Sequence, residues 1–181
     1  MGGEAEIVQF KGAVRHQLVT PEQRFVYDYW QSLCDGDGHP TRQDLDPMVL
    51  RRHLPFISLY ERGDDGRFAV RLAGTGFWNF FGAEIQGRAI VDLPMGEGCA
   101  YWTRVLDHVE STGAASAGVT KPHTPHGAGL QQFWLRLPLF GEDGGMVLGF
   151  DQFLKSAQTC DVRQPSPLTR PSFVHGEPLL A

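Results

Sequence analysis

The chain has 181 residues, of which 41% are hydrophobic and 20% charged, and its formal net charge is −5 at pH 7. This length suits one domain with extensions that needs no metal or disulfide for stability, and the negative charge disfavours nucleic-acid binding by the whole chain. The cysteines Cys34, Cys99 and Cys160 are widely spaced and indicate a reducing, cytoplasmic environment. No stretch approaches the 18 apolar residues of a membrane helix, and no signal peptide is evident.

The first strong element is an amphipathic helix over residues 20–34, which follows a polar lead over 1–19. Thr20 and Gln23 fit a capping box, with Pro21 at the first helical position. The aromatic face of this helix must be covered by the domain or by a second copy of the chain. We therefore expect a docking or homodimer interface made by Phe25, Tyr29, Trp30 and Leu33.

The remaining pattern predicts further helices and five strands. A helix is expected from Asp46 to Pro55 and a longer one over 97–111. The expected strands are 56–61, 67–73, 115–121, 129–140 and 145–155, with a hairpin turn at 142–145. Because the strands come in two antiparallel groups with helices between them, the fold class is α+β, with one five-stranded sheet and helices across one face. We divide the chain into an N-terminal lead 1–19, a domain 20–155 and a proline-containing tail 156–181.

The glycine-rich stretch "LAGTGFWNFFG" at 72–82 admits two interpretations. A dinucleotide loop needs G-x-G-x-x-G, but Asn79 stands at the third glycine position, and no Gly-Lys-Ser/Thr of a P-loop follows. The favoured interpretation is a sharp turn into a short helix whose rings wedge against a sheet.

The ordered set of motifs resembles a PAS domain. The pattern is a strand, Gly-Thr, a short helix, Phe-Gly-x-x-x-x-Gly-Arg and Asp-Leu, within "LAGTGFWNFFGAEIQGRAIVDL". Upstream "YDYWQSL" and "HPTRQDLDPMVLRRHLPFISLYE" and downstream "LRLPLFGEDG" resemble a group of small stand-alone PAS proteins common in alphaproteobacteria, over about residues 21–155.

The resemblance implies a bacterial sensory or regulatory module without catalytic residues, which acts by contact with a signalling protein such as a kinase or regulator. It also implies that sheet and helices enclose either a packed core or a pocket for a small apolar ligand; both remain open at this point. The alternatives are a small α+β cavity enzyme of the isomerase or cyclase type and a scaffold without ligand. The residues that we expect to line the pocket are Leu59, Val70, Leu72, Phe77, Trp78, Phe81, Trp102, Leu106, Phe133 and Leu135.

The titratable side chains give no defined chemical site. His123 and His126 make only half of a tetrahedral metal site, so we expect a polar loop there and no metal. No cofactor is expected; His108 is the one helix histidine to test as a haem ligand. The cavity-enzyme alternative would need His108 or Asp107 inside the pocket.

Overall fold

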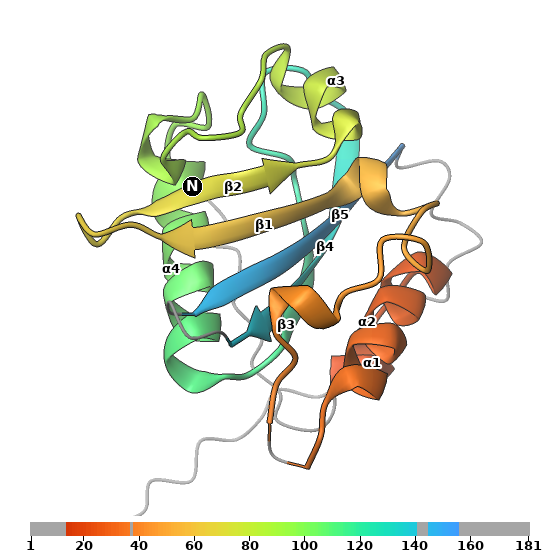
Figure 1. Ribbon diagram of the computed structural model, residues 1–181. Helices are drawn as coiled ribbons and strands as arrows, with labels where there is room; N and C mark the ends of the chain where they lie inside the picture. The colour runs from red at the N-terminus through yellow and green to blue at the C-terminus, as the bar shows by residue number, and fades with distance from the viewer. Residues whose placement is uncertain (1–13, 37, 141–144, 156–181) are drawn as a thin grey trace, which may run out of the picture.

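The computed structural model describes residues 14–36, 38–140 and 145–155. Five antiparallel strands form one sheet in the order β2-β1-β5-β4-β3 (Figure 1). The strands are β1 (Ile57–Arg62), β2 (Phe68–Ala73), β3 (Ser116–Thr120), β4 (Leu130–Leu139) and β5 (Met146–Lys155). The predicted fold class, an antiparallel five-stranded α+β sheet with helices, is confirmed.

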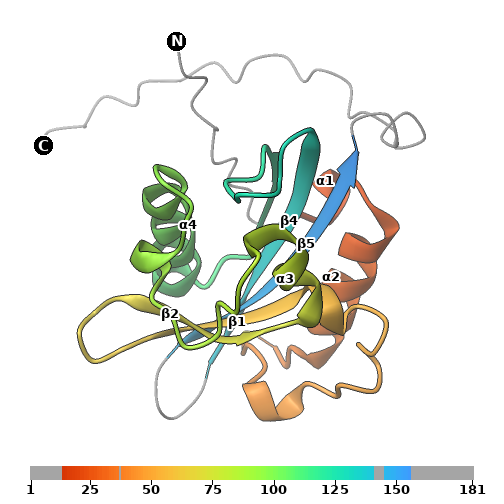
Figure 2. The ribbon, with the colours of Figure 1, turned by 90° about the horizontal axis from the view of Figure 1, so that it is seen from above.

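One face of the sheet, called the inner face here, is covered by the helices between β2 and β3. These are α3 (Trp78–Phe81) and the longer α4 (Gly98–Thr112), with one-turn 3₁₀ segments η3 (Thr75–Phe77) and η4 (Ile90–Asp92). Seen from above, α4 lies on the opposite side of the sheet from α1 and α2 (Figure 2). The stripe of α4 that packs on this face consists of Tyr101, Trp102, Val105, Leu106 and Val109.

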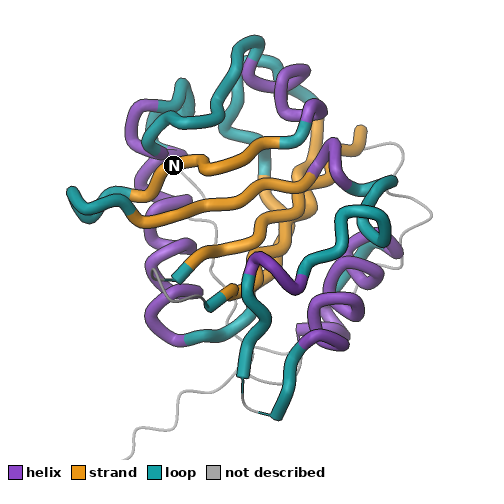
Figure 3. The backbone as a smooth tube through the Cα atoms, in the orientation of Figure 1, coloured by secondary structure: helices purple, strands orange, loops and turns teal. Residues whose placement is uncertain are grey.

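The outer face is covered by the N-terminal helices α1 (Val14–Gln17) and α2 (Pro21–Leu33), with the turns that follow them (Figure 3). Val26, Trp30 and Leu50 pack there against the apolar side chains of β4 and β5, among them Leu135 and Leu148. Helix α2 begins as the sequence predicts, because Thr20 and Gln23 form a capping box with Pro21 at the first position.

Two polar side chains of α2 attach this helix to β4. Gln23 is buried; its side-chain oxygen accepts hydrogen bonds from the backbone N–H groups of Val19 and Thr20, and its amide donates to the carbonyl of Trp134 at 3.0 Å. Trp30 donates its indole N–H to the carbonyl of Pro138 at 2.9 Å. Each side chain thereby pairs backbone groups that the apolar contact would otherwise leave without water.

A β-bulge in β2 changes the face of the sheet to which the side chains after it point. Leu59 pairs with Leu72 and Tyr60 with Val70, so that Arg71 is the extra residue. Phe68 and Val70 therefore face the inner core, whereas Leu72 turns to the outer one. Uninterrupted alternation would have placed all three apolar residues on one face, as the sequence pattern suggests.

The Gly-Thr-Gly turn after β2 is a site of close backbone packing. A Cβ atom on Gly74 would lie 2.0 Å from the carbonyl oxygen of Leu54, in the 3₁₀ turn η2 (Leu54–Phe56). Gly76 is similarly close to Pro55. These glycines let η2 pack against η3, so close backbone packing accounts for the glycine-rich stretch.

The predicted helix from Asp46 to Pro55 is wrong. Turns occupy 47–53, followed by η2, and a further 3₁₀ turn η1 (Arg42–Asp44) precedes them. Of the apolar residues in this segment only Leu50 is buried, while Met48, Val49 and Leu54 are exposed. A helix needs a continuous apolar face to be held by packing, and this segment has none.

The predicted strands, the helix over 20–34 and the helix over 97–111 match the structure to within one or two residues at their ends. Helix α1 was not predicted: it lies in the expected polar lead, where Val14 and Leu18 are buried in the outer core. The N-terminal lead before Val14, most of the 142–145 turn and the tail 156–181 lie outside the described residues. Among the residues that are described, no helix is both long and apolar enough to cross a bilayer.

Replacing Gln23 by Leu should lower the free energy of unfolding by about 2–4 kcal/mol, because two buried backbone groups and one half-buried backbone group lose their partner. The neighbouring change Glu22→Gln serves as control. Glu22 is half-buried in the first turn of α2, and loss of its charge there should cost at most about 1 kcal/mol. Urea denaturation followed by circular dichroism measures both. Equal effects of the two substitutions would contradict the role given to Gln23.

His53 packs between two rings, stacked on Phe25 at 4.7 Å and edge-on to Phe150 at 6.0 Å between ring centroids. Burial lowers the pKa of His53; nearby Glu22 opposes this and Arg52 adds to it. The unfolded chain therefore binds a proton more readily than the folded one as the pH falls below about 6.5, the ordinary histidine value.

We therefore expect the protein to lose more stability between pH 7 and pH 5 than its His53→Phe variant, which keeps an aromatic ring but cannot ionise. Thermal unfolding at both pH values measures this difference. A difference in melting temperature between the two proteins that stays constant with pH would show that His53 titrates alike in the folded and unfolded states.

Candidate functional site

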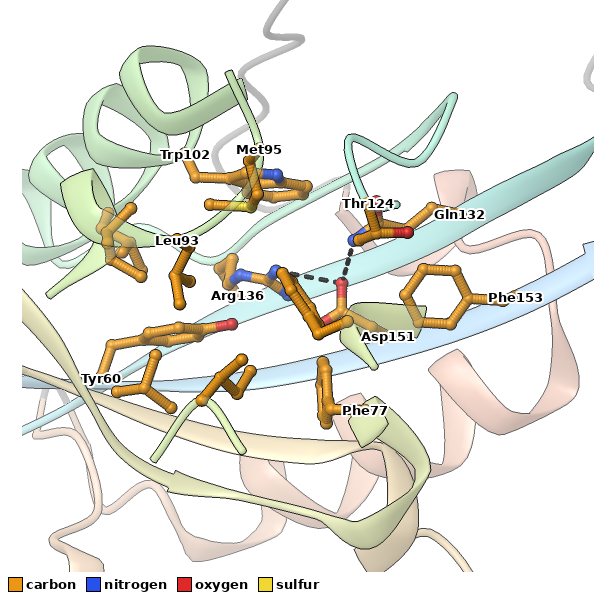
Figure 4. Close-up of a pocket in the computed structure, with 15 residues that line it drawn as sticks. Tyr60, Phe77, Leu93, Met95, Trp102, Thr124, Gln132, Arg136, Asp151 and Phe153 are labelled. Atoms are coloured by element: carbon orange, nitrogen blue, oxygen red, sulfur yellow. Dashed lines mark hydrogen bonds and ion pairs between the residues drawn. The ribbon is translucent and has the colours of Figure 1, made fainter. Parts of the chain in front are cut away.

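A small cavity of about 30 Å³ lies between the inner face of the sheet and helices α3 and α4. Most of its wall is apolar, but three polar side chains, Gln132, Arg136 and Asp151, form its floor (Figure 4). A volume of this size holds about two water molecules. The site is therefore a narrow space with apolar walls and a polar base.

Strand register places the polar floor. Gln132 and Arg136 lie two residues to either side of Trp134 on β4, so they share its inner face. Asp151 of β5 is the direct partner of Trp134, which brings its carboxylate between the two. No loop is needed, because one hairpin carries all three groups.

The carboxylate of Asp151 is the centre of the cluster. Its Oδ1 accepts a hydrogen bond from Nε2 of Gln132 at 2.7 Å and from Nη2 of Arg136 at 3.0 Å. The side chains of Arg136 and Asp151 are only 3% and 1% exposed, so this is a fully buried ion pair. Such pairs contribute little net stability because desolvation opposes the attraction. Stability alone therefore does not explain the pair, and we look for a functional reason.

Aromatic rings surround the guanidinium of Arg136. Its Cζ lies 4.5 Å from the ring centroid of Trp102 and 5.3 Å from that of Tyr60, both in the range of cation–π contacts. Gly149 of β5 makes the space, since a Cβ there would lie 2.7 Å from the Tyr60 ring and 3.3 Å from Nη1 of Arg136. Burial opposes the charge, but Asp151 and Tyr60 outweigh it and raise the pKa of Arg136.

Several buried polar atoms in the cavity have no hydrogen-bond partner. They are Oδ2 of Asp151, Oε1 of Gln132, Nε of Arg136 and Oγ1 of Thr124, which lines the cavity from the loop before β4. Each unpaired buried group costs about 1–3 kcal/mol. Their concentration in one cavity indicates a place where water or a ligand completes the bonding.

Five of the predicted pocket residues line this cavity and five do not. Those that line it are Val70, Phe77, Phe81, Trp102 and Leu106. Trp78 is 55% exposed, on the surface of α3. The other four lie on the outer side of the sheet: Leu59, Leu72, Phe133 and Leu135. A ligand-binding role for the five lining residues remains a prediction.

The misplaced residues have three structural causes. The bulge in β2 turns Leu72 to the outer face, where it pairs with Leu59 of β1. Leu135 belongs to the more apolar face of β4, and that face packs against α2 rather than against the cavity. Trp78 points outward because α3 is a single turn: Phe77 before it and Phe81 at its end line the cavity, and Phe80 packs on Phe153.

The polar floor was not found from the sequence. Glutamines on strands usually face solvent, whereas Gln132 is 5% exposed. A signal was available: the predicted hairpin between β4 and β5 necessarily brings Asp151 close to Trp134 and Arg136. An Asp and an Arg on facing strands that are apolar on both faces indicate a buried pair.

The histidines considered as ligands lie elsewhere. His108 is not among the cavity-lining residues, and neither is Asp107, which instead pairs with Arg62 at the rim of α4. His126 donates its backbone N–H to the carbonyl of Phe80, so its loop packs on α3. No group of three potential metal ligands occurs in the described part of the chain.

The predicted interface residues of α2 have different environments. Trp30 is buried against the sheet, and Leu33 is half-buried. The hydroxyl of Tyr29 accepts a hydrogen bond from the backbone N–H of Asp46 at 2.6 Å. Phe25 alone is exposed, at 43%. The helix thus docks on its own sheet, one of the two expected alternatives.

A scan against protein-family models matches residues 19–150 to the family described as PAS domain. The match covers well over half of the chain, and the chain belongs to the PAS domain family. No curated protein matches the chain significantly. No solved structure does so either.

Replacing Asp151 by Ala should lower the free energy of unfolding by about 3–5 kcal/mol, because it leaves the guanidinium of Arg136 buried without a counter-charge. The double variant Asp151→Leu/Arg136→Met should recover most of this loss, since neither charge is then buried. Urea titration of Asp151→Leu, Arg136→Met and their double variant completes the cycle and measures the coupling. Additive losses would show that the two groups do not act as a pair.

Proposed function

We propose that this PAS domain is a sensory and regulatory module in signal transduction, in which the state of the cavity is passed by α3 to a surface that contacts a partner protein. The observation that carries the proposal is the position of α3 and its preceding turn. Phe77 and Phe81 line the cavity, while Trp78 between them is 55% exposed. A change in cavity content that displaces Phe77 and Phe81 inside the protein therefore also displaces Trp78 on its surface.

The surface around Trp78 supports contact with a partner. Of the eight large hydrophobic side chains that are exposed in the described residues, five lie along α2, the 47–54 segment and α3: Phe25, Met48, Val49, Leu54 and Trp78. Phe25 is joined to this segment by its stack on His53, and η2 packs against η3, which precedes α3. Exposed apolar residues gathered in this way favour protein–protein contact.

The proposed partner is a signalling protein such as a kinase or regulator, which is the kind of partner that the resemblance to PAS domains implies. A homodimer through α2 would have to use Phe25 and this surface, since Trp30 already packs on the sheet. The cavity-enzyme alternative is less favoured, because the expected groups Asp107 and His108 do not line the cavity.

Filling the cavity should change the environment of Trp78. Leu106 lines the cavity and is fully buried, so Leu106→Phe overfills the space at a cost of about 1–3 kcal/mol and pushes Phe77 and Phe81 outward. The chain has four tryptophans. With 5-fluorotryptophan labelling and assignment by Trp78→Phe, the ¹⁹F resonance of Trp78 should shift.

Leu137→Phe is the matched control, because Leu137 is equally buried but belongs to the outer core. This variant should leave the Trp78 resonance in place while costing similar stability. A Trp78 resonance that is unchanged by Leu106→Phe, or that moves equally with Leu137→Phe, would contradict a path from the cavity through α3.

A further inference from the structure

We infer that the cavity takes a small uncharged molecule with N–H or O–H donors, of the primary amide or diol type, and not the apolar ligand that the sequence suggests. The inference rests on the proposed function in treating this cavity as the sensory site. The argument for this ligand class is that particular donor and acceptor atoms in the cavity have no hydrogen-bond partner.

The unused capacity is mainly that of acceptors. Both donors that reach Asp151 bind its Oδ1, so Oδ2 is left without a partner, and Oε1 of Gln132 is likewise unpaired. Asp151 is 1% exposed and Gln132 5%, so bulk water does not satisfy these atoms. A ligand that fits must offer at least two donors, one toward each oxygen.

An anionic ligand is disfavoured by the same atoms. Oδ2 of Asp151 would repel it, and the guanidinium of Arg136 is already bonded to Asp151 and to the carbonyls of Leu135 and Phe150. Only Nε of Arg136 remains unpaired. The hydroxyl of Thr124, which can donate or accept, is also unpaired in the cavity. Unused donors and acceptors side by side suit a neutral molecule that both donates and accepts, rather than a carboxylate or phosphate.

A cationic ligand is disfavoured by Arg136. This guanidinium already covers the faces of Trp102 and Tyr60, the two rings that would attract a second cation. The pair of Arg136 with Asp151 is neutral overall, so a cation would add an uncompensated charge to a buried site. A purely apolar ligand would leave both oxygens permanently unpaired.

The size of the cavity limits the ligand and links it to α3. A volume of about 30 Å³ has room for only a few heavy atoms. Anything larger displaces the wall that Phe77 and Phe81 form. Ligand size therefore decides how far α3 moves, while the polar floor decides which chemistry is accepted.

Acetamide, acetone and acetate test the inference with the full chain, since they have the same shape and differ only in donors and charge. The readout is the indole N–H resonance of Trp102, a cavity-lining residue. We expect a saturable shift with acetamide and at least tenfold weaker binding of acetone and acetate. Gln132→Met removes one acceptor and should weaken acetamide binding at least tenfold.

Gln152→Met is the control, because Gln152 also has an unpaired buried oxygen but pairs with Phe133 on the outer face. It should leave acetamide binding unchanged. Lack of a saturable shift with acetamide, or equal binding of acetone or acetate, overturns the ligand class even if Leu106→Phe still moves Trp78. Conversely, donor-selective binding with an immobile Trp78 supports the ligand class and rejects the sensory coupling.

Discussion

The structure depends on one constraint: β4 is buried on both faces, and its side chains alternate strictly between them. Phe133, Leu135 and Leu137 belong to the side covered by α2, whereas Gln132, Trp134 and Arg136 belong to the side covered by α4. Because the period is two, a shift of one residue would put the guanidinium under α2 and leucines in the cavity. The outer core and the polar floor are therefore specified together by one register.

The N-terminal helix contributes to this constraint from the outer side. Gln23 and Trp30 bond to carbonyls of β4 itself, at Trp134 and Pro138. Those carbonyls lie in the strand whose other face carries the cavity floor. Helix α2 on the outer face and the cavity floor on the inner face thus both contact β4. A displacement of β4 would therefore affect both faces of the sheet.

The buried pair of Arg136 with Asp151 is an expensive arrangement in an otherwise apolar interior. Well-packed apolar residues of similar volume are often at least as stabilising as a buried ion pair. The pair is bordered by Gln132 and Tyr60 and by unpaired atoms that face the cavity. The pair therefore supports the proposal that the cavity floor selects a ligand, and the rings on both sides of the adjoining α3 support the proposal that this helix transmits the state of the cavity.

The sequence by itself determined the family, the class of fold and the order of the elements, and it separated the ring-bearing turn at 74–82 from a phosphate loop. These properties are local: capping at Thr20, alternation along β4 and the glycines after β2 are visible in short windows. Half of the predicted pocket residues, including Phe77 and Trp102, do line the cavity, because local patterns were enough to place them.

The tertiary structure alone decided which face of each strand meets which helix. The bulge at Arg71 moves Leu72 to the outer face, and α2 takes the more apolar side of β4, leaving the polar side to the cavity. Alternation within a strand says that two faces differ but not what covers each of them. That choice depends on contacts between residues more than a hundred positions apart, such as Gln23 with Trp134, which no local pattern records.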